Sequence, residues 1–307
     1  MKKINFKAKR TQDLVFCLLI LLIPMIQFMI FYVGVNINSF AMVFQRYEVD
    51  ATTGRGQYVL VDSLFENVEK LFFQLRFEGV LKPAIINSFI SFVAISLVGI
   101  TISLVFSLYI FKKLPGAGIF KVLLFTPSIL SAVVTVTMYR SFVDIVIPKV
   151  FNMGNGELGL LSNPNTKFGT IIFYNIWIGF GTQILMYSGA MNGIDPSITE
   201  AAKLDGANPW IEFFYIILPL IFPTIQTFLV TGVAGIFTNQ INLVAFESLS
   251  AHVKYNTIGY YLFRKAAAPT QYEYPVWATM GALLTLVAAP LTLIFRWLLD
   301  KFGPSVD

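Results

Sequence analysis

The segment 194–211 contains the residues whose types and spacing point most clearly to a function. Asp195 precedes Pro196, and this pair suits the N-terminal cap and the first position of a helix. Glu200 then begins a run, Glu-Ala-Ala-Lys-Leu, that strongly favours helix. Gly206 suits the left-handed residue that follows a helix C-terminus. The spacing predicts one short helix that begins at Pro196 and ends just before Gly206.

The residues in and after this short helix, predicted over 196–205, bear on whether it meets a partner. Ala201 and Ala202 are small, so they would let a partner surface approach closely. Asn208 followed by Pro209 prevents the helix from continuing and permits a new one to begin. On physical grounds, an interaction role and a plain connecting role both fit this pattern.

A second group of candidate residues is polar but uncharged and lies inside long apolar stretches. Amides, hydroxyls and aromatic faces are the groups that a sugar requires, because it offers many donors and acceptors together with apolar C–H faces. The residues expected to line the pathway of a solute are Asn175, Thr182, Gln183, Thr231 and Asn239. Asn, Gln and Thr also form hydrogen bonds between helices in lipid, so both roles stay open.

Other kinds of chemistry lack the residues that they need. The single cysteine, Cys17, excludes an intrachain disulfide and a cysteine-based metal cluster, and the single histidine, His252, excludes a His-rich metal site. The sequence has no Gly-x-x-x-x-Gly-Lys-Ser/Thr phosphate loop, so the chain does not hydrolyse ATP itself. We therefore expect no catalytic residue, no metal and no cofactor, and a membrane-embedded enzyme is disfavoured.

The composition indicates a membrane protein. Of the 307 residues, 13% are charged and 56% are hydrophobic, whereas an ordinary soluble domain carries roughly 25% charged residues. A soluble core of this size would not hide so much apolar surface, which argues against a soluble enzyme, a nucleic-acid-binding domain and a disordered chain. The net charge of +5 is then a signal of topology rather than of nucleic-acid binding.

Six apolar stretches of about 20 residues carry no charge, and each predicts a transmembrane helix, because lipid cannot pair with backbone groups. They are Leu14–Val35, Ala84–Phe111, Val122–Tyr139, Phe168–Ile194, Phe213–Phe246 and Tyr274–Phe295. The fifth is too long for one straight span, so only about Phe213–Phe237 is expected to cross. The predicted fold class is an all-α, polytopic membrane protein with six transmembrane helices.

The distribution of Lys and Arg orients these helices. Basic residues cluster in the arm 2–10, in the connection 112–121 and after the last helix, so both termini are expected in the cytoplasm. The outer connections would then be 36–83, 145–167 and 238–275.

We divide the chain into three parts. Residues 1–83 would hold the cytoplasmic arm, the first helix and an extracellular segment, in which residues 61–75 have the spacing of an amphipathic helix. Residues 84–300 would form the core with five helices and the loop 194–211, and residues 301–307 a cytoplasmic tail.

The motif around Glu200 resembles one that is known. Three runs stand at the spacing of the EAA loop of ABC transporter permeases, in particular of the larger subunit type in maltose and glycerol-phosphate importers: Glu200-Ala201-Ala202, Asp205-Gly206 and Leu218-Pro219. Asn87-Ser88-Phe89 and Phe125-Thr126-Pro127 resemble that family's approach to its second helix and its third helix. The resemblance covers roughly residues 60–300, with Ile217 as a departure where the family often has Thr.

The resemblance implies a type I importer permease fold and a mechanism. In that family the loop is a coupling helix that docks into a cleft of a cytoplasmic ATPase, and closure of the ATPase dimer turns the permease pair from inward-facing to outward-facing. It implies that Glu200 pairs with a basic group of the ATPase, or else stays a solvated helix charge. Ala201 and Ala202 would allow close packing against the ATPase, and Gly206 would allow the turn after the helix. The motif would end at Pro219. Asp205 is expected to make a local structural contact.

The same resemblance implies partners and a location. The partners are a second permease subunit in a heterodimer, a dimer of cytoplasmic ATP-binding subunits, an extracellular solute-binding protein, membrane lipid and a carbohydrate-like solute, with no nucleic acid. The location is the bacterial plasma membrane. Two alternatives remain open: the same fold importing a peptide or an amino acid, and an ion-coupled carrier, against which the scarcity of intramembrane carboxylates argues.

Overall fold

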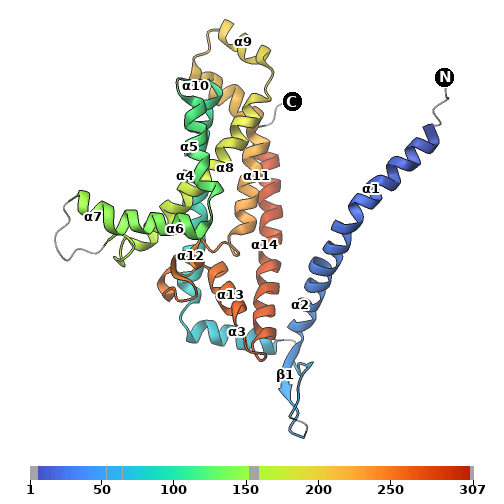
Figure 1. The fold of residues 1–307 in the computed structure, drawn as a ribbon. Coiled ribbons are helices and arrows are strands. Elements are labelled where there is room, and N and C mark those ends of the chain that lie inside the picture. Colours follow the sequence, from blue (N-terminus) through green and yellow to red (C-terminus); the bar gives the residue numbers. More distant parts are fainter. Residues whose placement is uncertain (1–5, 53, 64, 152–158, 305–307) are drawn as a thin grey trace. The chain divides into compact units, whose positions relative to one another are not determined.

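The computed structural model describes residues 6–52, 54–63, 65–151 and 159–304 (Figure 1). Lys2 and Lys3 of the predicted basic arm, and part of the predicted 301–307 tail, lie outside these residues. The chain forms two compact units, one drawn from residues 1–74 and 268–283 and the other from 75–267 and 284–307.

The first unit begins with one long helical run. α1 (Phe6–Phe28), the π-helical turn η1 (Met29–Gly34) and α2 (Val35–Val43) follow one another without a break, and their side chains from Leu14 onward are almost all exposed. Because these side chains are apolar, lipid is the environment that suits them. The predicted first span is therefore confirmed, and it extends to Val43.

A small hairpin in this unit was not predicted from the sequence. β1 (Gln45–Val49) pairs antiparallel with β2 (Gly56–Leu60), with Gln45 opposite Leu60. The Asp50 carboxylate accepts a hydrogen bond from the Thr52 amide at 2.7 Å, which stabilises the turn. The predicted all-α class is nevertheless confirmed, because helices make up nearly all of the regular structure in the described residues and the hairpin adds two short strands.

An amphipathic helix follows the hairpin, as the spacing over 61–75 predicted. α3 (Glu66–Phe77) buries Leu71 and Leu75 and exposes Phe73. Asn67, only 2% exposed, donates from Nδ2 to the carbonyl groups that flank residue 44, at 2.8 Å each. A buried amide thus holds the point where the long helix ends and the hairpin begins.

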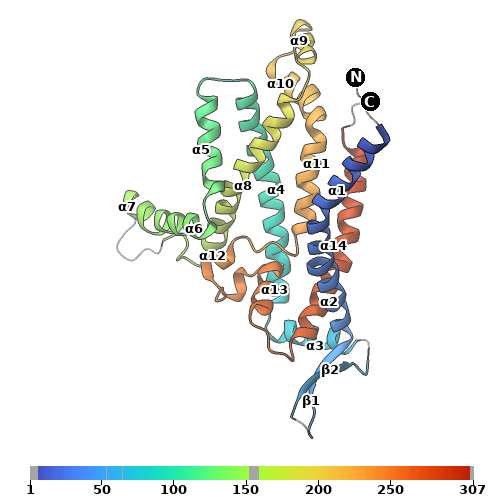
Figure 2. The same ribbon diagram turned by 45° about the vertical axis from the view of Figure 1, so that its right-hand side comes forward.

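The second unit is a helical bundle. Its further elements are α4 (Leu81–Phe111), α5 (Ala117–Ile129), α6 (Ala132–Ser141), η2 (Phe142–Val146), α7 (Ile147–Val150), α8 (Lys167–Asn192), α9 (Pro196–Leu204), α10 (Pro209–Glu212), η3 (Phe213–Ile217), α11 (Leu218–Gly235), α12 (Leu243–Glu247), η4 (Val253–Tyr255) and α13 (Ile258–Ala267), and α14 (Tyr274–Phe302) contributes its second half. Figures 1 and 2 show α4 and α8 side by side. Small residues allow this contact: Ser103 Oγ donates to Gln183 Oε1 at 2.9 Å, and Ser107 Oγ to the Ile184 carbonyl at 3.2 Å.

Five helices among the described residues are long and apolar enough to cross a membrane, and a bent pair would make a sixth. The five are Leu14–Val43, Leu81–Phe111, Lys167–Asn192, Pro209–Gly235 and Tyr274–Phe302. They match the predicted first, second, fourth, fifth and sixth spans to within a few residues, apart from the longer ends of the first and last.

The predicted third span, Val122–Tyr139, is wrong as a single straight helix. The α5 helix and the run Ala132–Val150 meet at an angle of 107°, and both ribbon views show that run projecting sideways (Figures 1 and 2). The backbone leaves the helical region at Leu130 (φ −77°, ψ 151°) and Ser131 (φ −57°, ψ 138°). With 13 residues, α5 is about 20 Å long, which is shorter than the hydrocarbon core of about 30 Å.

Two glycines of α8 provide a matched test of the α5–α8 contact. A Cβ at Gly181 would lie 2.6 Å from the Leu124 carbonyl oxygen, whereas a Cβ at Gly179 would meet nothing within 4 Å. We expect Gly181→Ala to lower the free energy of unfolding by about 1–3 kcal/mol, because the helices must separate. Gly179→Ala should leave it unchanged or slightly higher. Thermal unfolding in detergent measures both, and equal melting temperatures would contradict the close contact.

Candidate functional site

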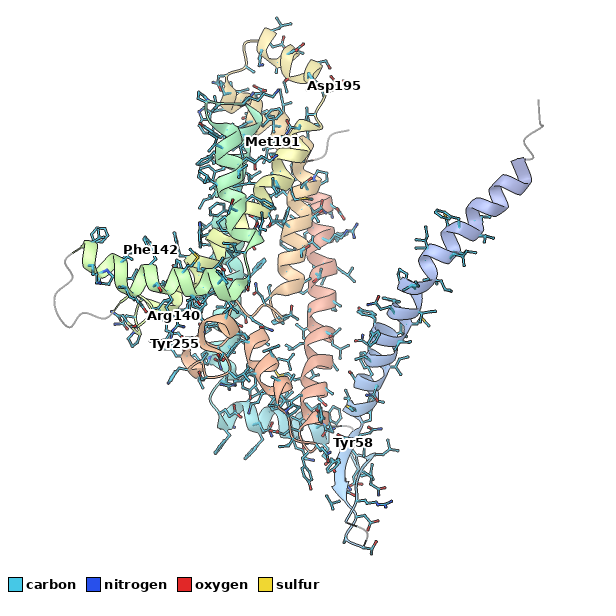
Figure 3. All side chains as sticks on the ribbon, in the orientation of Figure 1. Tyr58, Arg140, Phe142, Met191, Asp195 and Tyr255 are labelled. Carbon is cyan, nitrogen blue, oxygen red and sulfur yellow. The ribbon has the colours of Figure 1, made fainter. Side chains whose placement is uncertain are left out.

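The short helix expected from the sequence is present as α9, and its N-terminus is capped. The Asp195 Oδ1 atom accepts a hydrogen bond from the Ser197 amide at 2.9 Å, and Pro196 occupies the first helical position. This backbone amide holds the pKa of the Asp195 carboxyl below its usual value. Figure 3 shows Asp195 at the start of α9 and Met191 near the end of α8. The cap lets this short helix form at the end of the bundle.

The turn after α9 is fixed by backbone geometry and by a second cap. Gly206 has a φ of +80°, and the amide of Ala207 donates to the Ala202 carbonyl at 2.9 Å. The side chain of Asn208 then accepts from the amides of residues 210 and 211 at 3.0 and 2.9 Å, which starts α10 at Pro209. A side chain at Gly206 would strain the left-handed backbone. Two capped helices are thus joined by a turn with little freedom.

The surface of α9 is mostly open. Figures 1 and 2 show this helix beyond the ends of α8 and α11. Glu200, Ala201 and Asp205 are exposed, whereas Ala202 is only 7% exposed and its backbone carbonyl accepts the hydrogen bond from Ala207 in the turn. Leu204, which was not among the predicted contact residues, is an apolar side chain that is 89% exposed. An apolar and acidic surface of this kind is suited to contact with a protein partner.

A buried ion pair lies at the base of the loop. Lys112 follows the last residue of α4, and its Nζ lies 2.6 Å from Glu212 Oε1 at the end of α10. Glu212 is 2% exposed. A groove of about 710 Å³ adjoins the pair, and its lining includes Tyr109, Lys203 and Trp210. In the sequence, Lys112 is only a signal of topology, and no local pattern links it to a residue 100 positions later.

Asn175, one of the five predicted pathway residues, is buried and fully engaged. Its Nδ2 donates to the carbonyl groups of Ile171 and Ile241 at 2.8 and 2.9 Å, and its Oδ1 accepts from Asn242 Nδ2 at 2.7 Å. It therefore ties α8 to the turn that precedes α12. In this conformation it has the interhelical role that the sequence left open as an alternative.

The other four predicted pathway residues are differently placed. Thr182, Thr231 and Asn239 are exposed, and Gln183 is half-buried against Ser103 of α4. The Thr231 hydroxyl donates to its own helix. A cavity of about 60 Å³ between α4 and α11 is lined by Asn239 and by none of the other four. This cavity therefore does not bring the five predicted residues together.

The small cavity is lined by hydroxyl groups that were not among the predicted pathway residues. Ser88, Ser91 and Ser96 of α4 line it together with Asn239 and Thr257. Ser88 Oγ accepts from the Ile258 amide at 2.9 Å, and Thr257 Oγ1 donates to the Asn239 carbonyl at 2.9 Å. The hydroxyls of Ser88 and Thr257 thus pair with backbone groups. Nothing in the spacing of these residues along the sequence indicates a site.

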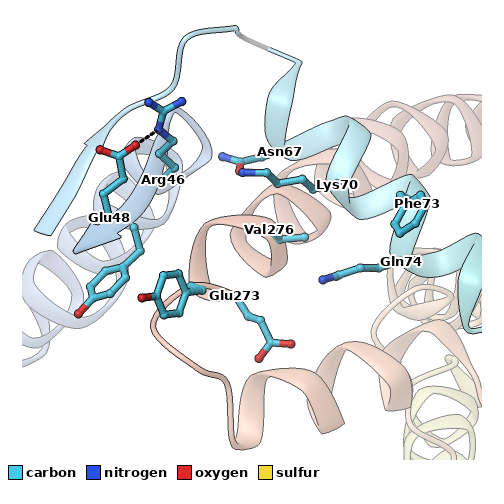
Figure 4. Close-up of a pocket in the computed structure, with 10 residues that line it drawn as sticks. Arg46, Glu48, Asn67, Lys70, Phe73, Gln74, Glu273 and Val276 are labelled. Atoms are coloured by element: carbon cyan, nitrogen blue, oxygen red, sulfur yellow. Dashed lines mark ion pairs between the residues drawn. The ribbon is translucent and has the colours of Figure 1, made fainter. Parts of the chain in front are cut away.

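A larger hollow lies within the first unit. It has a volume of about 630 Å³ (Figure 4). Its lining residues are Arg46, Tyr47, Glu48, Asn67, Lys70, Phe73, Gln74, Tyr272, Glu273 and Val276. The charges are already paired, since Arg46 Nε lies 2.7 Å from Glu48 Oε1 and Lys70 Nζ lies 2.6 Å from Glu66 Oε1. Among the described residues, no group of three or more His, Cys, Asp or Glu is placed to hold a metal ion.

The chain matches one family model. Residues 114–307 match the family described as "Binding-protein-dependent transport system inner membrane component". The matched region contains α9, the capped turn and Glu212, and it makes up more than half of the chain.

Curated relatives cover less of the chain. The maltose/maltodextrin transport system permease protein MalF is 26% identical in Salmonella typhimurium (42% of this chain, 26% of that protein), 25% in Yersinia pestis (63% and 40%) and 24% in Escherichia coli K12 (53% and 33%). The matches thus span only between about a quarter and two fifths of the length of these relatives.

Solved structures match the whole fold. A chain in a crystal structure of a bacterial alginate ABC transporter, in complex with an alginate pentasaccharide-bound periplasmic protein, has a TM-score of 0.75 and 21% identity, with 99% of both chains covered. A chain in a second structure, of an ABC transporter involved in alginate import, has a TM-score of 0.73, also at 21% identity, over 97% of this chain and 99% of that one. At this identity the likeness concerns the fold, and it supports the type I importer architecture.

The cap of α9 can be tested without a partner. We expect Asp195→Ala to raise amide hydrogen exchange in 197–204 about fivefold, while Asp195→Asn, which keeps an acceptor, should not. Because the folded pKa is depressed, the cap contributes fully above the unfolded pKa and is lost as pH falls through the folded one. Protection of α9 should therefore fall at acidic pH in the unchanged chain but not in the Asn variant. Identical pH profiles would contradict the cap.

Proposed function

Because the chain belongs to the family of binding-protein-dependent transport system inner membrane components, we propose that it is the permease subunit of an ATP-driven importer for a sugar or oligosaccharide. The observation that carries the proposal is α9, a capped helix that projects from the end of the bundle with Glu200 exposed. Such a helix is a rigid surface that a second protein can push or pull. The powering reaction is assigned to a separate subunit, since the sequence has no phosphate loop.

In the proposed mechanism, the loop 194–211 transmits ATPase movement to the transmembrane helices. Glu200 pairs with a basic group of the ATPase, and the exposed Leu204 and Ala201 pack against it. Packing at the base of the loop supports this route, because Met191 of α8, Phe213 and Ile217 of η3 and Ile100 of α4 share one buried cluster. Closely packed side chains transmit displacement, since an interior has few voids to absorb it. Movement of α9 would then change the spacing of the helices that line the pathway.

The solute class is proposed from two observations. The relatives named above transport maltose and maltodextrin, and the structures of similar fold concern alginate. The spans of this chain carry amides, hydroxyls and aromatic rings but almost no carboxylates, which suits a polyhydroxyl solute better than an inorganic cation. Asn239 beside the small cavity is one proposed contact, and Thr182, Gln183 and Thr231 are further proposed pathway residues. Asn175 would join them only if its present hydrogen bonds open.

The proposed assembly has four kinds of component. This chain pairs with a second permease subunit in a heterodimer, a dimer of ATP-binding subunits contacts α9 from the cytoplasm, and a solute-binding protein delivers the solute from outside. Both termini are then cytoplasmic, in the plasma membrane of a bacterium. The loop 194–211 and the basic connection 112–121 lie on the same side in this orientation, which agrees with the 2.6 Å contact between Lys112 and Glu212.

Two variants test the coupling role. In proteoliposomes with all partner subunits, Glu200→Lys should reduce ATP-dependent uptake about tenfold or more, because it reverses the charge offered to the ATPase. Gly206→Val should do the same, because a β-branched residue is strained at a φ of +80°. Membrane insertion should be unchanged in both. Glu69→Lys is the matched control, since it makes the same charge reversal at an exposed position of α3.

A competition experiment tests the solute class. Labelled maltotriose and an alginate oligosaccharide should be taken up with ATP, and an excess of either unlabelled sugar should reduce uptake, whereas dipeptides and amino acids should not. Uptake driven by an ion gradient without ATP would contradict the proposal. Uptake of a labelled dipeptide in place of either sugar would keep the coupling mechanism and replace the solute.

A further inference from the structure

The ion pair between Lys112 and Glu212 joins elements that are far apart in the sequence. Lys112 lies at the C-terminal end of α4, and Glu212 is the last residue of α10, the helix that follows the turn after α9. Their charged atoms are 2.6 Å apart, with Glu212 2% exposed and the Lys112 side chain 23% exposed. The contact is therefore a specific link between the base of the loop and the end of a membrane-spanning helix.

The surroundings make this pair costly to maintain for stability alone. Phe213, the residue after Glu212, and Ile217 are buried, and Leu108 and Phe111 of α4 pack against the same cluster. A buried carboxylate loses its hydration, and an apolar pair of similar size in such a place is often as stable or more stable. What an ion pair supplies and an apolar contact does not is a fixed distance and register between two particular atoms.

The backbone after Glu212 explains why a lateral link is useful. Residues 213–217 form the π-helical turn η3, which separates α10 from α11. π-helical turns are locally widened and are frequent at functional sites. Because the helix is not regular at this point, α10 is held in place from the side, by α4, as well as along its own axis.

We propose that Lys112 and Glu212 are positioning residues that make the inner end of α4 move together with the coupling helix α9. The capped turn at 205–208 fixes α9 to α10, and the ion pair fixes α10 to α4. α4 in turn contacts α8 through Ser103 and Gln183. A displacement of α9 thus reaches two membrane-spanning helices and not only α11. This inference rests on the coupling role proposed above for α9, and it adds the route by which the movement enters the membrane.

The decisive variant removes both charges and keeps the volume. The double variant Lys112→Met/Glu212→Met leaves no unpaired buried charge, so it should fold and melt near the temperature of the unchanged protein. Lys112→Arg keeps the pair and serves as the conservative variant. Lys113→Met is the matched control, because Lys113 is the exposed neighbour and makes no ion pair among the residues that the structure describes.

Two measurements read the effect. In the chain alone, reconstituted in nanodiscs, the double variant should lose protection from hydrogen exchange over 205–212, whereas Lys112→Arg and Lys113→Met should not. In the full complex, the number of maltotriose molecules taken up per ATP hydrolysed should fall about fivefold or more in the double variant only. A purely structural pair would lower yield or melting temperature without changing that ratio.

The outcomes separate the inference from the function on which it rests. Unchanged exchange over 205–212 in the double variant overturns the positioning role, as does an unchanged ratio of solute to ATP in a complex that transports. If the unchanged complex shows no ATP-dependent uptake of any probe, the proposed function fails. In that case the exchange measurement still decides whether the pair holds α10 against α4.

Discussion

Lipid cannot form hydrogen bonds with a peptide group, and this constraint governs the structure. Every backbone donor and acceptor in the bilayer must be paired within the protein, which is why long helices account for nearly all of the regular structure described. The helices are nevertheless interrupted at several points. Each break exposes carbonyl and amide groups that need new partners, and the cost of leaving them unpaired in an apolar medium is several kcal/mol per group.

Buried asparagines supply many of these partners. Asn67 serves the point where the first long helix meets the hairpin, and Asn175 serves the turn before α12. Asn87 of α4, 8% exposed, donates from Nδ2 to the carbonyl groups of Lys254 and Asn256 at 2.8 and 2.9 Å. An asparagine side chain has two donors and an acceptor on a short stem, so one residue pairs with two backbone carbonyls at once. The same chemistry makes it attractive as a sugar contact, and the sequence alone does not separate the two uses.

The parts of the chain that were predictable are those whose signals are local. The cap at Asp195 and the left-handed Gly206 act within a few residues, and both stand where the sequence placed them. The new helix expected after the Asn208-Pro209 pair is also present, although the cap that Asn208 supplies was not predicted. The apolar stretches likewise located five spans. The bend after α5 was not foreseen, because its residues are as apolar as those of a straight helix and only the backbone at Leu130 and Ser131 departs. The allocation of the Asn175 hydrogen bonds and the pairing of Lys112 with Glu212 depend on tertiary contacts between distant residues.

The contact made by Asn175 has a consequence for repeated conformational cycles. The hydrogen bonds that cross from this side chain to the 241–242 turn number two, and neither belongs to a helical ladder. Breaking these two hydrogen bonds would therefore leave α8 intact and cost on the order of 1–3 kcal/mol. Two hydrogen bonds of that strength are strong enough to stabilise one conformation and weak enough to break within a transport cycle. The contact between α8 and the 241–242 turn can therefore break and re-form while the helix itself stays intact.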